Sequence, residues 1–331
     1  MAEPLLDVRG LTTRFRTERG EVTAVDDVSF SLAAGETLAI VGESGSGKSV
    51  TALSLLRLIP QPPGRIEADA IRFEGRDLLT LDEAGMRAIR GNRIAMIFQE
   101  PMSSLNPALT VGLQVAEPIN VHRKAAWSRA FDAARGLLER VQIPDAQSRL
   151  RTYPHQYSGG MRQRTMIAMA LACQPRLIIA DEPTTALDVT VQAQILDLLK
   201  DLTRETGAAL ILITHDLGVV ARYADRVAVM YGGRMVEEAS AGALYRDPRH
   251  PYTRGLLASV PRVDARPGAR LVPIEGSPPD LAALPPGCAF APRCRIAEAT
   301  CGAERPGLRA VSADHRHACL RDAAAWAGAA P

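Results

Sequence analysis

Gly42-Glu43-Ser44-Gly45-Ser46-Gly47-Lys48-Ser49 is the segment of this 331-residue chain that predicts most about its fold. An apolar run, residues 37–41, precedes the stretch, and a helical pattern at residues 50–58 follows it. In a strand–loop–helix of this kind, successive backbone N–H groups surround phosphate oxygens at a helix N-terminus. The stretch therefore predicts a phosphate-binding loop in which Lys48 reaches the β- and γ-phosphates and Ser49 binds Mg²⁺. A flexible turn with an exposed lysine is the alternative.

Three further apolar runs indicate the class of fold. They occupy residues 94–98, 177–180 and 209–213. Runs that are apolar throughout are typical of parallel strands buried on both faces, and helical patterns separate these runs. We therefore expect an α/β domain with a mostly parallel sheet. Between about residues 107 and 156 the patterns are helical (Ala125 to Val141) without a convincing strand, which predicts an inserted helical subdomain.

Polar side chains follow two of these runs. Asp181 and Glu182 end one run, and His215 comes directly after Thr214 at the end of another. Because ligands of open α/β sheets gather at the carboxyl ends of strands, all three side chains are expected at the phosphate site. Asp181 suits the Mg²⁺ shell, Glu182 suits the polarisation of an attacking water, and a neutral His215 suits a γ-phosphate contact. Solvated caps and a structural histidine are the alternatives.

Composition limits the class of protein. The chain is 47% hydrophobic and carries 39 basic and 37 acidic residues, so its charge gives no argument for nucleic acid as a partner. No run of 18 apolar residues and no signal-peptide pattern is present, which predicts a cytosolic protein.

The motifs together resemble the nucleotide-binding domains of ABC transporters. Between the phosphate loop and the acidic strand lie Gln99 and the signature Tyr157-Ser158-Gly159-Gly160-Met161, and a D-loop at residues 185–188 precedes His215. The resemblance implies a P-loop NTPase fold over residues 1–245, with a RecA-like core, an antiparallel β edge and a helical subdomain at about 107–165. It also implies Mg²⁺-dependent ATP hydrolysis in a head-to-tail dimer, where the signature of one subunit covers the ATP of the other.

The resemblance assigns roles residue by residue. Glu182, His215 and Gln99 correspond to catalytic positions, and Ser49, Gln99 and Asp181 to Mg²⁺ ligands. Phe15 lies where an aromatic ring stacks on adenine, although it could be an ordinary half-buried strand residue. Met161 replaces the usual glutamine and Thr185 the usual serine, which leaves the efficiency of closure open. The positions that correspond to ATP contacts are Phe15, Gly42, Ser44, Gly45, Gly47, Lys48, Ser49, Ser158, Gly159, Gly160 and Asp188.

Two segments are similar to one branch of this family, the dipeptide/oligopeptide (peptide/nickel) importers. These segments are Glu100 to Pro107 and the His250-Pro251-Tyr252 motif, for which the residues themselves indicate no chemical role. The similarity implies an ATP-hydrolysing D-type subunit on the cytoplasmic face of the bacterial inner membrane. Its partners would be a paralogous ATP-binding subunit, two permeases and, indirectly, a substrate-binding protein. Import of nickel or another small solute is the alternative, and a soluble ATPase acting on DNA or ribosomes and a redox regulator are rival classes.

The region 246–331 is rich in proline and carries four of the five cysteines. Cys288, Cys294, Cys301 and Cys319 are separated by five, six and seventeen residues. Four thiolates hold zinc or an iron–sulfur cluster, and the paired spacing usual for zinc is missing. The spacing, with Phe290, Arg293 and His317 nearby, resembles that of importer subunits with a 4Fe–4S cluster; zinc and free thiols remain alternatives. We expect a small irregular Cys-rich domain that buries little apolar core, whereas Cys173 should be a small buried hydrophobe.

Overall fold

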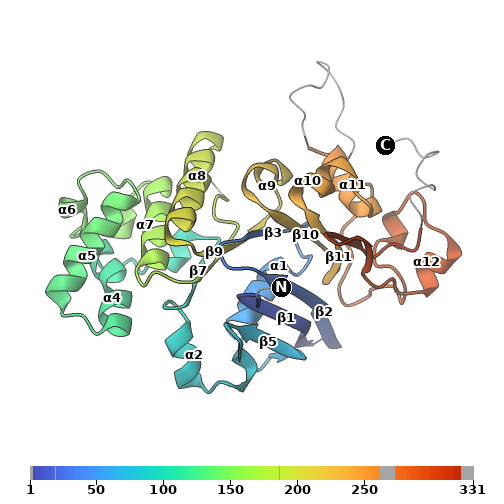
Figure 1. Ribbon diagram of the computed structural model, residues 1–331, viewed down its shortest axis with the longest axis horizontal. Coiled ribbons are helices and arrows are strands. Elements are labelled where there is room, and N and C mark those ends of the chain that lie inside the picture. Colours follow the sequence, from blue (N-terminus) through green and yellow to red (C-terminus); the bar gives the residue numbers. More distant parts are fainter. Residues whose placement is uncertain (1–2, 19, 186, 261–272, 322–331) are drawn as a thin grey trace, which may run out of the picture. The chain divides into compact units, whose positions relative to one another are not determined.

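The computed structural model describes residues 3–18, 20–185, 187–260 and 273–321. They divide into two units. Unit 1 comprises Met1–Pro4, Leu32–Glu36 and Leu78–Ile213, and unit 2 comprises Leu5–Ser31, Thr37–Asp77 and Thr214–Pro331. Figure 1 colours the chain from blue to red along the sequence.

Unit 1 contains a parallel sheet and a group of helices. The sheet has the order β9-β8-β7, and its register places Leu177 opposite both Ile94 and Ala209. Helices α4, α5 and α7 pack against one another, and α7 also contacts β7 and α8. The elements are η1 (Leu78–Thr80), α2 (Glu83–Ile89), β7 (Ile94–Ile97), α3 (Pro101–Ser104), α4 (Val111–Arg123), α5 (Trp127–Arg140), α6 (Ala146–Arg149), η2 (Pro154–Gln156), α7 (Gly159–Leu171), β8 (Leu177–Asp181), α8 (Val189–Thr206) and β9 (Ala209–Thr214).

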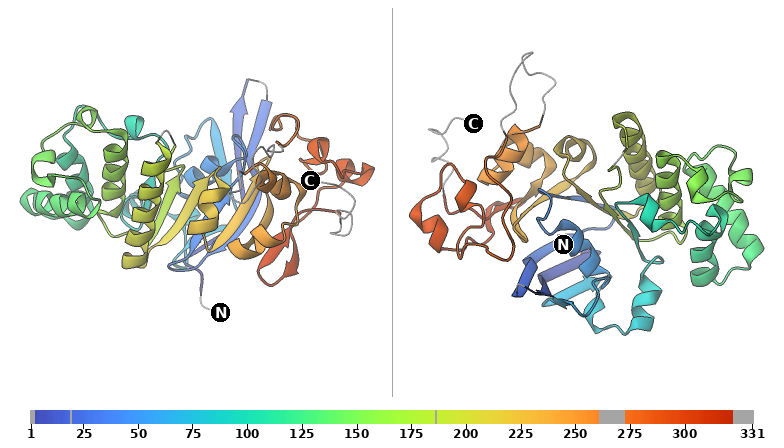
Figure 2. Two further views of the ribbon diagram at one scale, coloured as in Figure 1. Left: turned by 90° about the horizontal axis from the view of Figure 1, so that it is seen from above. Right: turned by 180° about the vertical axis from the view of Figure 1, so that it is seen from behind.

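The region expected to be a helical subdomain is helical in the structure. Residues 107–165, all of which are described, contain α4, α5, α6, η2 and the start of α7, and no strand. Both views of Figure 2 show these green helices clustered together. The amphipathic pattern from Ala125 to Val141 corresponds to α5, whose buried face is formed by Ala130, Ala134 and Leu138. The apolar stripe of that helix therefore faces its neighbours, as its sequence period requires.

Unit 2 contains two sheets. One is antiparallel with the order β2-β1-β5-β6, and β4 also pairs with β1. In the other, β3 pairs in parallel with β10, and the order continues through β11 and β13 to β12. The elements are β1 (Leu6–Thr17), β2 (Gly20–Leu32), β3 (Thr37–Val41), α1 (Lys48–Leu55), β4 (Gly64–Glu67), β5 (Ala70–Phe73), β6 (Arg76–Asp77), α9 (Leu217–Tyr223), β10 (Arg226–Tyr231), β11 (Arg234–Ser240), α10 (Ala241–Arg246), α11 (Pro251–Ala258), η3 (Ala291–Arg293), α12 (Ala299–Ala303), β12 (Arg309–Ser312) and β13 (His315–His317).

The C-terminal region shares a hydrophobic core with the strands of unit 2. Tyr252 from α11 and Phe290 are buried in one cluster with Val41 from β3 and Tyr231 from β10. The hairpin β12–β13 extends the sheet because β13 pairs with β11. The region contributes few buried large side chains of its own, and Tyr252 and Phe290 complete a core that the strands begin. The proposed boundary near residue 245 stays a prediction, and the division into units does not follow it.

In the part of the chain that the structure describes, no helix is long and apolar enough to span a membrane.

Candidate functional site

The phosphate-loop residues of unit 2 connect strand β3 to helix α1. The strand ends at Val41 and the helix begins at Lys48, with Gly47 as its N-cap at φ 100°. A Cβ atom on Gly47 would lie 2.5 Å from the carbonyl oxygen of Ala24. Gly47 thus has both a left-handed backbone and a neighbour that leaves no space for a side chain. These two restraints fix the backbone at Gly47, where the loop ends and helix α1 begins.

Lys48 is buried within the loop that it closes. Its Nζ atom donates hydrogen bonds to the carbonyl oxygens of Gly42 and Glu43 at 2.8 and 2.9 Å. Its side chain therefore lies along the loop, where an ammonium group can also contact phosphate oxygens. Ser44 and Gly45 are exposed, and Ser49 is half-buried in the first turn of α1. The loop presents backbone N–H groups at the start of a helix, which favours an anion.

The acidic pair lies at the carboxyl end of β8 in unit 1. Asp181 is the last residue of the strand and is 5% exposed. Glu182 follows with φ 44°, a left-handed conformation that is rare for a glutamate and that often marks a functional position. Its Oε2 atom accepts hydrogen bonds from Gln99 Nε2 and from Thr185 Oγ1, both at 3.0 Å. A carboxylate fixed in this way can accept a proton from a water molecule or orient that water.

The hydrogen bonds of Glu182 give roles to two neighbouring residues. Gln99 follows β7 and is exposed, and its side-chain amide donates to Glu182. Thr185, which replaces the usual serine, has a hydroxyl that donates to Glu182. The substitution therefore preserves the hydrogen bond. Ala186, part of the predicted D-loop, lies outside the described residues.

The signature and the D-loop each cap a helix of unit 1. Ser158 is the N-cap of α7 and accepts a hydrogen bond from the backbone N–H of Met161. Because this contact uses the main chain, methionine in place of glutamine preserves it. Gly159 is exposed, and a Cβ atom on Gly160 would lie 3.0 Å from Val191. Asp188 is the N-cap of α8 and accepts from the N–H of Val191.

Two other predicted residues lie in unit 2. Phe15, on β1, is half-buried and pairs with Gly64 on β4. His215 is exposed and directly precedes Asp216, which caps α9 by accepting from the N–H groups of Gly218 and Val219.

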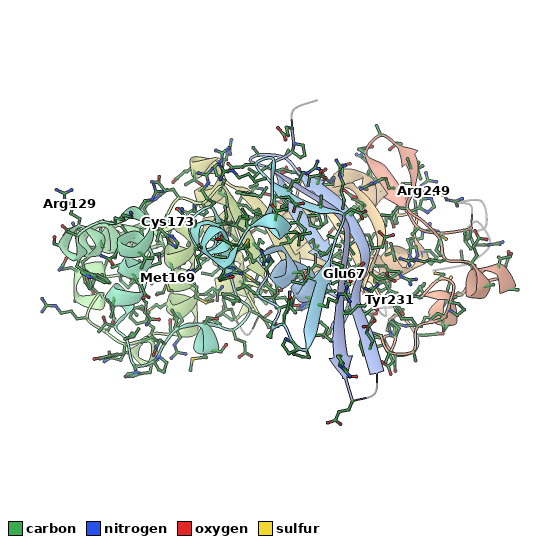
Figure 3. The ribbon with its side chains drawn as sticks, turned by 90° about the horizontal axis from the view of Figure 1, so that it is seen from below. Glu67, Arg129, Met169, Cys173, Tyr231 and Arg249 are labelled. Carbon is green, nitrogen blue, oxygen red and sulfur yellow. The ribbon has the colours of Figure 1, made fainter. Side chains whose placement is uncertain are left out.

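The four cysteines of the C-terminal region lie near one another in unit 2. The backbone N–H of Cys288 donates to the carbonyl of Cys301 at 2.8 Å. Burial raises the pKa of the Cys294 thiol to about 11, with smaller contributions from Cys319, Cys288 and Cys301. The neighbouring thiols therefore oppose ionisation of Cys294. Cys173, by contrast, is buried among the helices of unit 1, and its Sγ donates to the carbonyl of Pro118 (Figure 3).

The cysteines do not converge on a position for a single ion. Among the described residues, no group of three or more His, Cys, Asp or Glu side chains is arranged to hold a metal ion. The Mg²⁺ ligands proposed from the sequence, Ser49, Gln99 and Asp181, carry the hydroxyl, amide and carboxylate oxygens that Mg²⁺ prefers. Their assignment rests on the sequence and on the chemistry of these groups.

Glu43, a loop residue with no role predicted from the sequence, has two partners in the C-terminal region. Its backbone N–H donates to Tyr252 Oη, and its carboxylate accepts from Arg293. The partners are 209 and 250 residues away in the chain, a separation that no local pattern reveals. The His-Pro-Tyr motif and the cysteine spacing drew attention to Tyr252 and Arg293, but they did not indicate that these residues contact Glu43.

Comparisons with known proteins identify the class to which this arrangement belongs. The model of the family described as ABC transporter matches residues 25–185. Two similar solved structures are both dimeric structures of the bacterial ABC transporter cassette MJ0796. One of them is in a post-hydrolysis state bound to ADP and Pi. That structure has a TM-score of 0.62 and 28% identity, and the match covers 71% of this chain and 98% of that one. The cassette cbiO1 from Clostridium perfringens has a TM-score of 0.63 and 26% identity over 74% and 92% of the two chains.

Full-length relatives show the family. The chain is 54% identical to a Brucella melitensis protein assigned by its name to peptide import, over 96% of this chain and 97% of that one. It is 52% identical to the dipeptide transport ATP-binding protein DppD of Bacillus subtilis, over 96% and 94%. The chain therefore belongs to the ATP-binding proteins of the ABC transporter family. Within that family, residues 236–301 match the C-terminal region of oligopeptide/dipeptide transporters.

Proposed function

We propose that this chain is the ATP-hydrolysing subunit that powers the import of peptides across a bacterial inner membrane, from its cytoplasmic face. Its partners are a second, paralogous ATP-binding subunit, two membrane permeases and, indirectly, a substrate-binding protein. The observation that carries the ATPase assignment is the fixed position of Glu182, held by Gln99 and Thr185 beside buried Asp181. The similarity to peptide-import proteins along nearly the whole chain supports the choice of cargo.

Each group has a defined task in the reaction. The loop N–H groups and Lys48 bind the β- and γ-phosphates, and Phe15 stacks on adenine. Ser49, Gln99 and Asp181 would hold Mg²⁺, which would supply positive charge beside the phosphates. Glu182 takes up the proton of the attacking water, and His215 contacts the γ-phosphate. Ser158, Gly159, Gly160 and Asp188 complete the ATP site of the partner subunit.

Replacement of Glu182 by glutamine tests the ATPase assignment. The change Glu182→Gln keeps the size of the side chain and removes its basicity, so ATP hydrolysis should fall by about a hundredfold or more while ATP binding persists. Lys48→Ala should weaken nucleotide binding itself. The measurements are steady-state phosphate release and equilibrium ATP binding, and unchanged turnover in Glu182→Gln would remove Glu182 from this role.

The cargo is tested in the assembled transporter. Proteoliposomes with the permeases, the binding protein and the paralogous subunit should take up a labelled di- or oligopeptide only with ATP. Uptake of nickel but not of peptides would favour the alternative cargo.

We also propose that Cys288, Cys294, Cys301 and Cys319 hold a 4Fe–4S cluster with a structural or regulatory role. Zinc would draw four sulfur atoms to about 2.3 Å from one ion, whereas a cluster binds its thiolates through separate iron atoms. The proposal rests on the cysteine spacing and on its resemblance to that of importer subunits that carry such a cluster. The cluster would supply the positive charge that keeps these thiolates deprotonated.

The test of the cluster uses two cysteine variants. Anaerobically purified protein should be brown and contain iron and acid-labile sulfide. Cys294→Ser should remove the colour and make the C-terminal region more sensitive to protease, whereas Cys173→Ser, a change of a buried cysteine in unit 1, should leave both unchanged. Stoichiometric zinc without iron would contradict the proposal.

A further inference from the structure

Glu43 is the phosphate-loop residue to which the C-terminal region is attached. All three of its polar groups have partners: the N–H donates to Tyr252 Oη at 2.7 Å, the C=O accepts from Lys48 Nζ at 2.9 Å, and the carboxylate accepts from Arg293. The backbone hydrogen bond with Tyr252 and the ion pair with Arg293 come from two different segments of unit 2. The first half of the loop is therefore fixed from outside, and the same residue contacts the lysine that binds phosphate.

Contacts with several residues fix the position of the Arg293 side chain. Its two terminal nitrogens lie 2.6 and 3.0 Å from the two carboxylate oxygens of Glu43, a bidentate geometry. Its Nε donates to the carbonyl of Glu275 at 2.9 Å, and one terminal nitrogen lies 3.3 Å from Tyr231 Oη. The side chain is 6% exposed, against 25% for Glu43. The hydrogen bonds with Glu43 raise the pKa of the Arg293 guanidinium, so Arg293 remains charged.

Tyr252 is equally constrained. It lies in the first turn of α11, where its backbone N–H donates to Nδ1 of His250, the N-cap. Its ring is fully buried, with ring centroids 4.5 Å from Tyr231 and 5.5 Å from Phe290. Tyr231 is labelled in Figure 3, near the orange loops of the C-terminal region. The ring has one position, and its hydroxyl oxygen is consequently fixed at the N–H of Glu43.

We infer that Tyr252 and Arg293 are positioning residues for nucleotide binding, which act by holding Glu43 and hence the phosphate loop in its binding conformation. This inference rests on the proposed ATPase function. A loop of glycines and serines loses much conformational freedom when it closes on phosphates. Contacts that order the loop beforehand reduce that loss and increase affinity. Release of Glu43 should therefore raise Kd and KM for nucleotide and change kcat much less.

The test compares matched pairs of variants in the full-length protein. Tyr252→Phe removes only the hydroxyl that accepts from Glu43, while Thr253→Val removes a neighbouring buried hydroxyl that has no hydrogen-bond partner within the described ranges. Arg293→Gln removes the bidentate pair, while Arg295→Gln removes an exposed pair with Glu275 in the same segment. Kd for Mg-ADP is measured by titration calorimetry, and KM and kcat for Mg-ATP by phosphate release.

In each pair the first variant should weaken nucleotide binding, whereas the control, Thr253→Val or Arg295→Gln, should not. Tyr252→Phe removes one neutral hydrogen bond and should raise Kd and KM by about three- to tenfold. Arg293→Gln removes two charge-assisted hydrogen bonds, each of which contributes more free energy, and should raise Kd and KM by about ten- to a hundredfold. Arg293→Lys, which keeps the charge but not the fork, should fall between Arg293→Gln and the wild type. Glu43→Gln combined with Arg293→Gln should be less than additive, because both act on one contact.

Two results would overturn the inference. One is wild-type Kd and KM in Tyr252→Phe and Arg293→Gln; the other is a loss of thermal stability in these variants with unchanged nucleotide affinity, which would give the contacts a purely structural role. Failure of the proposed function is separate, because in that case the wild-type protein itself would not hydrolyse ATP.

Discussion

Gly47 combines two restraints on a single residue. Its φ of 100° and the Ala24 carbonyl 2.5 Å from a Cβ position both exclude a side chain. Gly47→Ala should therefore destabilise the protein by about 1–3 kcal/mol and weaken nucleotide binding, since the loop must move. Gly136, within α5, has nothing within 4 Å of a Cβ position, and Gly136→Ala should stabilise the protein by about 0.5–1 kcal/mol. Urea unfolding of both variants checks these signs, and equal effects would contradict the argument.

Local spacing accounts for what could be predicted at this scale. Lys48 and Glu182 were identified from their places after apolar runs, because a strand end determines where the next side chains lie. The left-handed backbone of Glu182 and its bond with Thr185 were not visible, since they depend on how the chain turns after β8. The role of Glu43 was missed for a different reason. Its partners are distant in the sequence, and a glutamate within a glycine-rich loop carries no distinctive pattern.

Helix α11 begins with an unusual cap that gives the protein a predictable pH response. Burial lowers the pKa of His250 to about 3, and the nearby His317 adds to the shift. The unfolded imidazole, with a pKa of about 6.5, binds a proton that the folded one excludes. Between these values the unfolded state holds more protons, so the free energy of unfolding falls as the pH falls below about 6.5. Glu237, which accepts from the N–H of His250, and its partner His315 face the same region.

His250→Asn tests this contribution. Asparagine keeps an N-cap acceptor and removes the titrating group, so the loss of stability between pH 7 and pH 5 should be smaller than in the wild type by about 2 kcal/mol. Urea unfolding at the two pH values measures the difference. The exposed His155 supplies the control, because His155→Asn should leave the wild-type pH dependence intact. An unchanged pH dependence in His250→Asn would show that the imidazole is not the source.

Strands and helices of the core were predicted more accurately than the C-terminal elements. The apolar runs at 37–41 and 94–98 correspond to β3 and β7 almost to the residue. A short run that is apolar throughout is typical of a parallel strand buried on both faces, which is why these strands could be predicted. The hairpin β12–β13 was not predicted. Its strands have four and three residues, and β12 is exposed throughout, so their sequence has no apolar alternation. Pairing of β13 with β11, not an intrinsic pattern, defines that hairpin.

At the scale of the whole molecule, the phosphate loop and the signature lie in different units of the chain. Both end at the N-terminus of a helix, α1 and α7, and both therefore offer N–H groups to an anion. Ser158 and Gly159 are exposed, so the signature is available to a second subunit. This availability supports the proposed head-to-tail dimer, in which each ATP joins the loop of one subunit to the signature of the other.

The dimer gives a prediction about association. A nucleotide that fills both anion sites should hold two subunits together, and slow hydrolysis should preserve that state. Glu182→Gln protein, alone or mixed with its paralogous partner, should therefore double in mass with Mg-ATP and remain monomeric with Mg-ADP, whose missing γ-phosphate leaves the signature without a ligand. Light scattering coupled to size exclusion measures the mass. Adding Lys48→Ala to Glu182→Gln should abolish the ATP effect, since the loop then binds nucleotide weakly. The same mass in ATP and ADP, with and without the partner subunit, would contradict a composite site, because ATP would then bridge nothing.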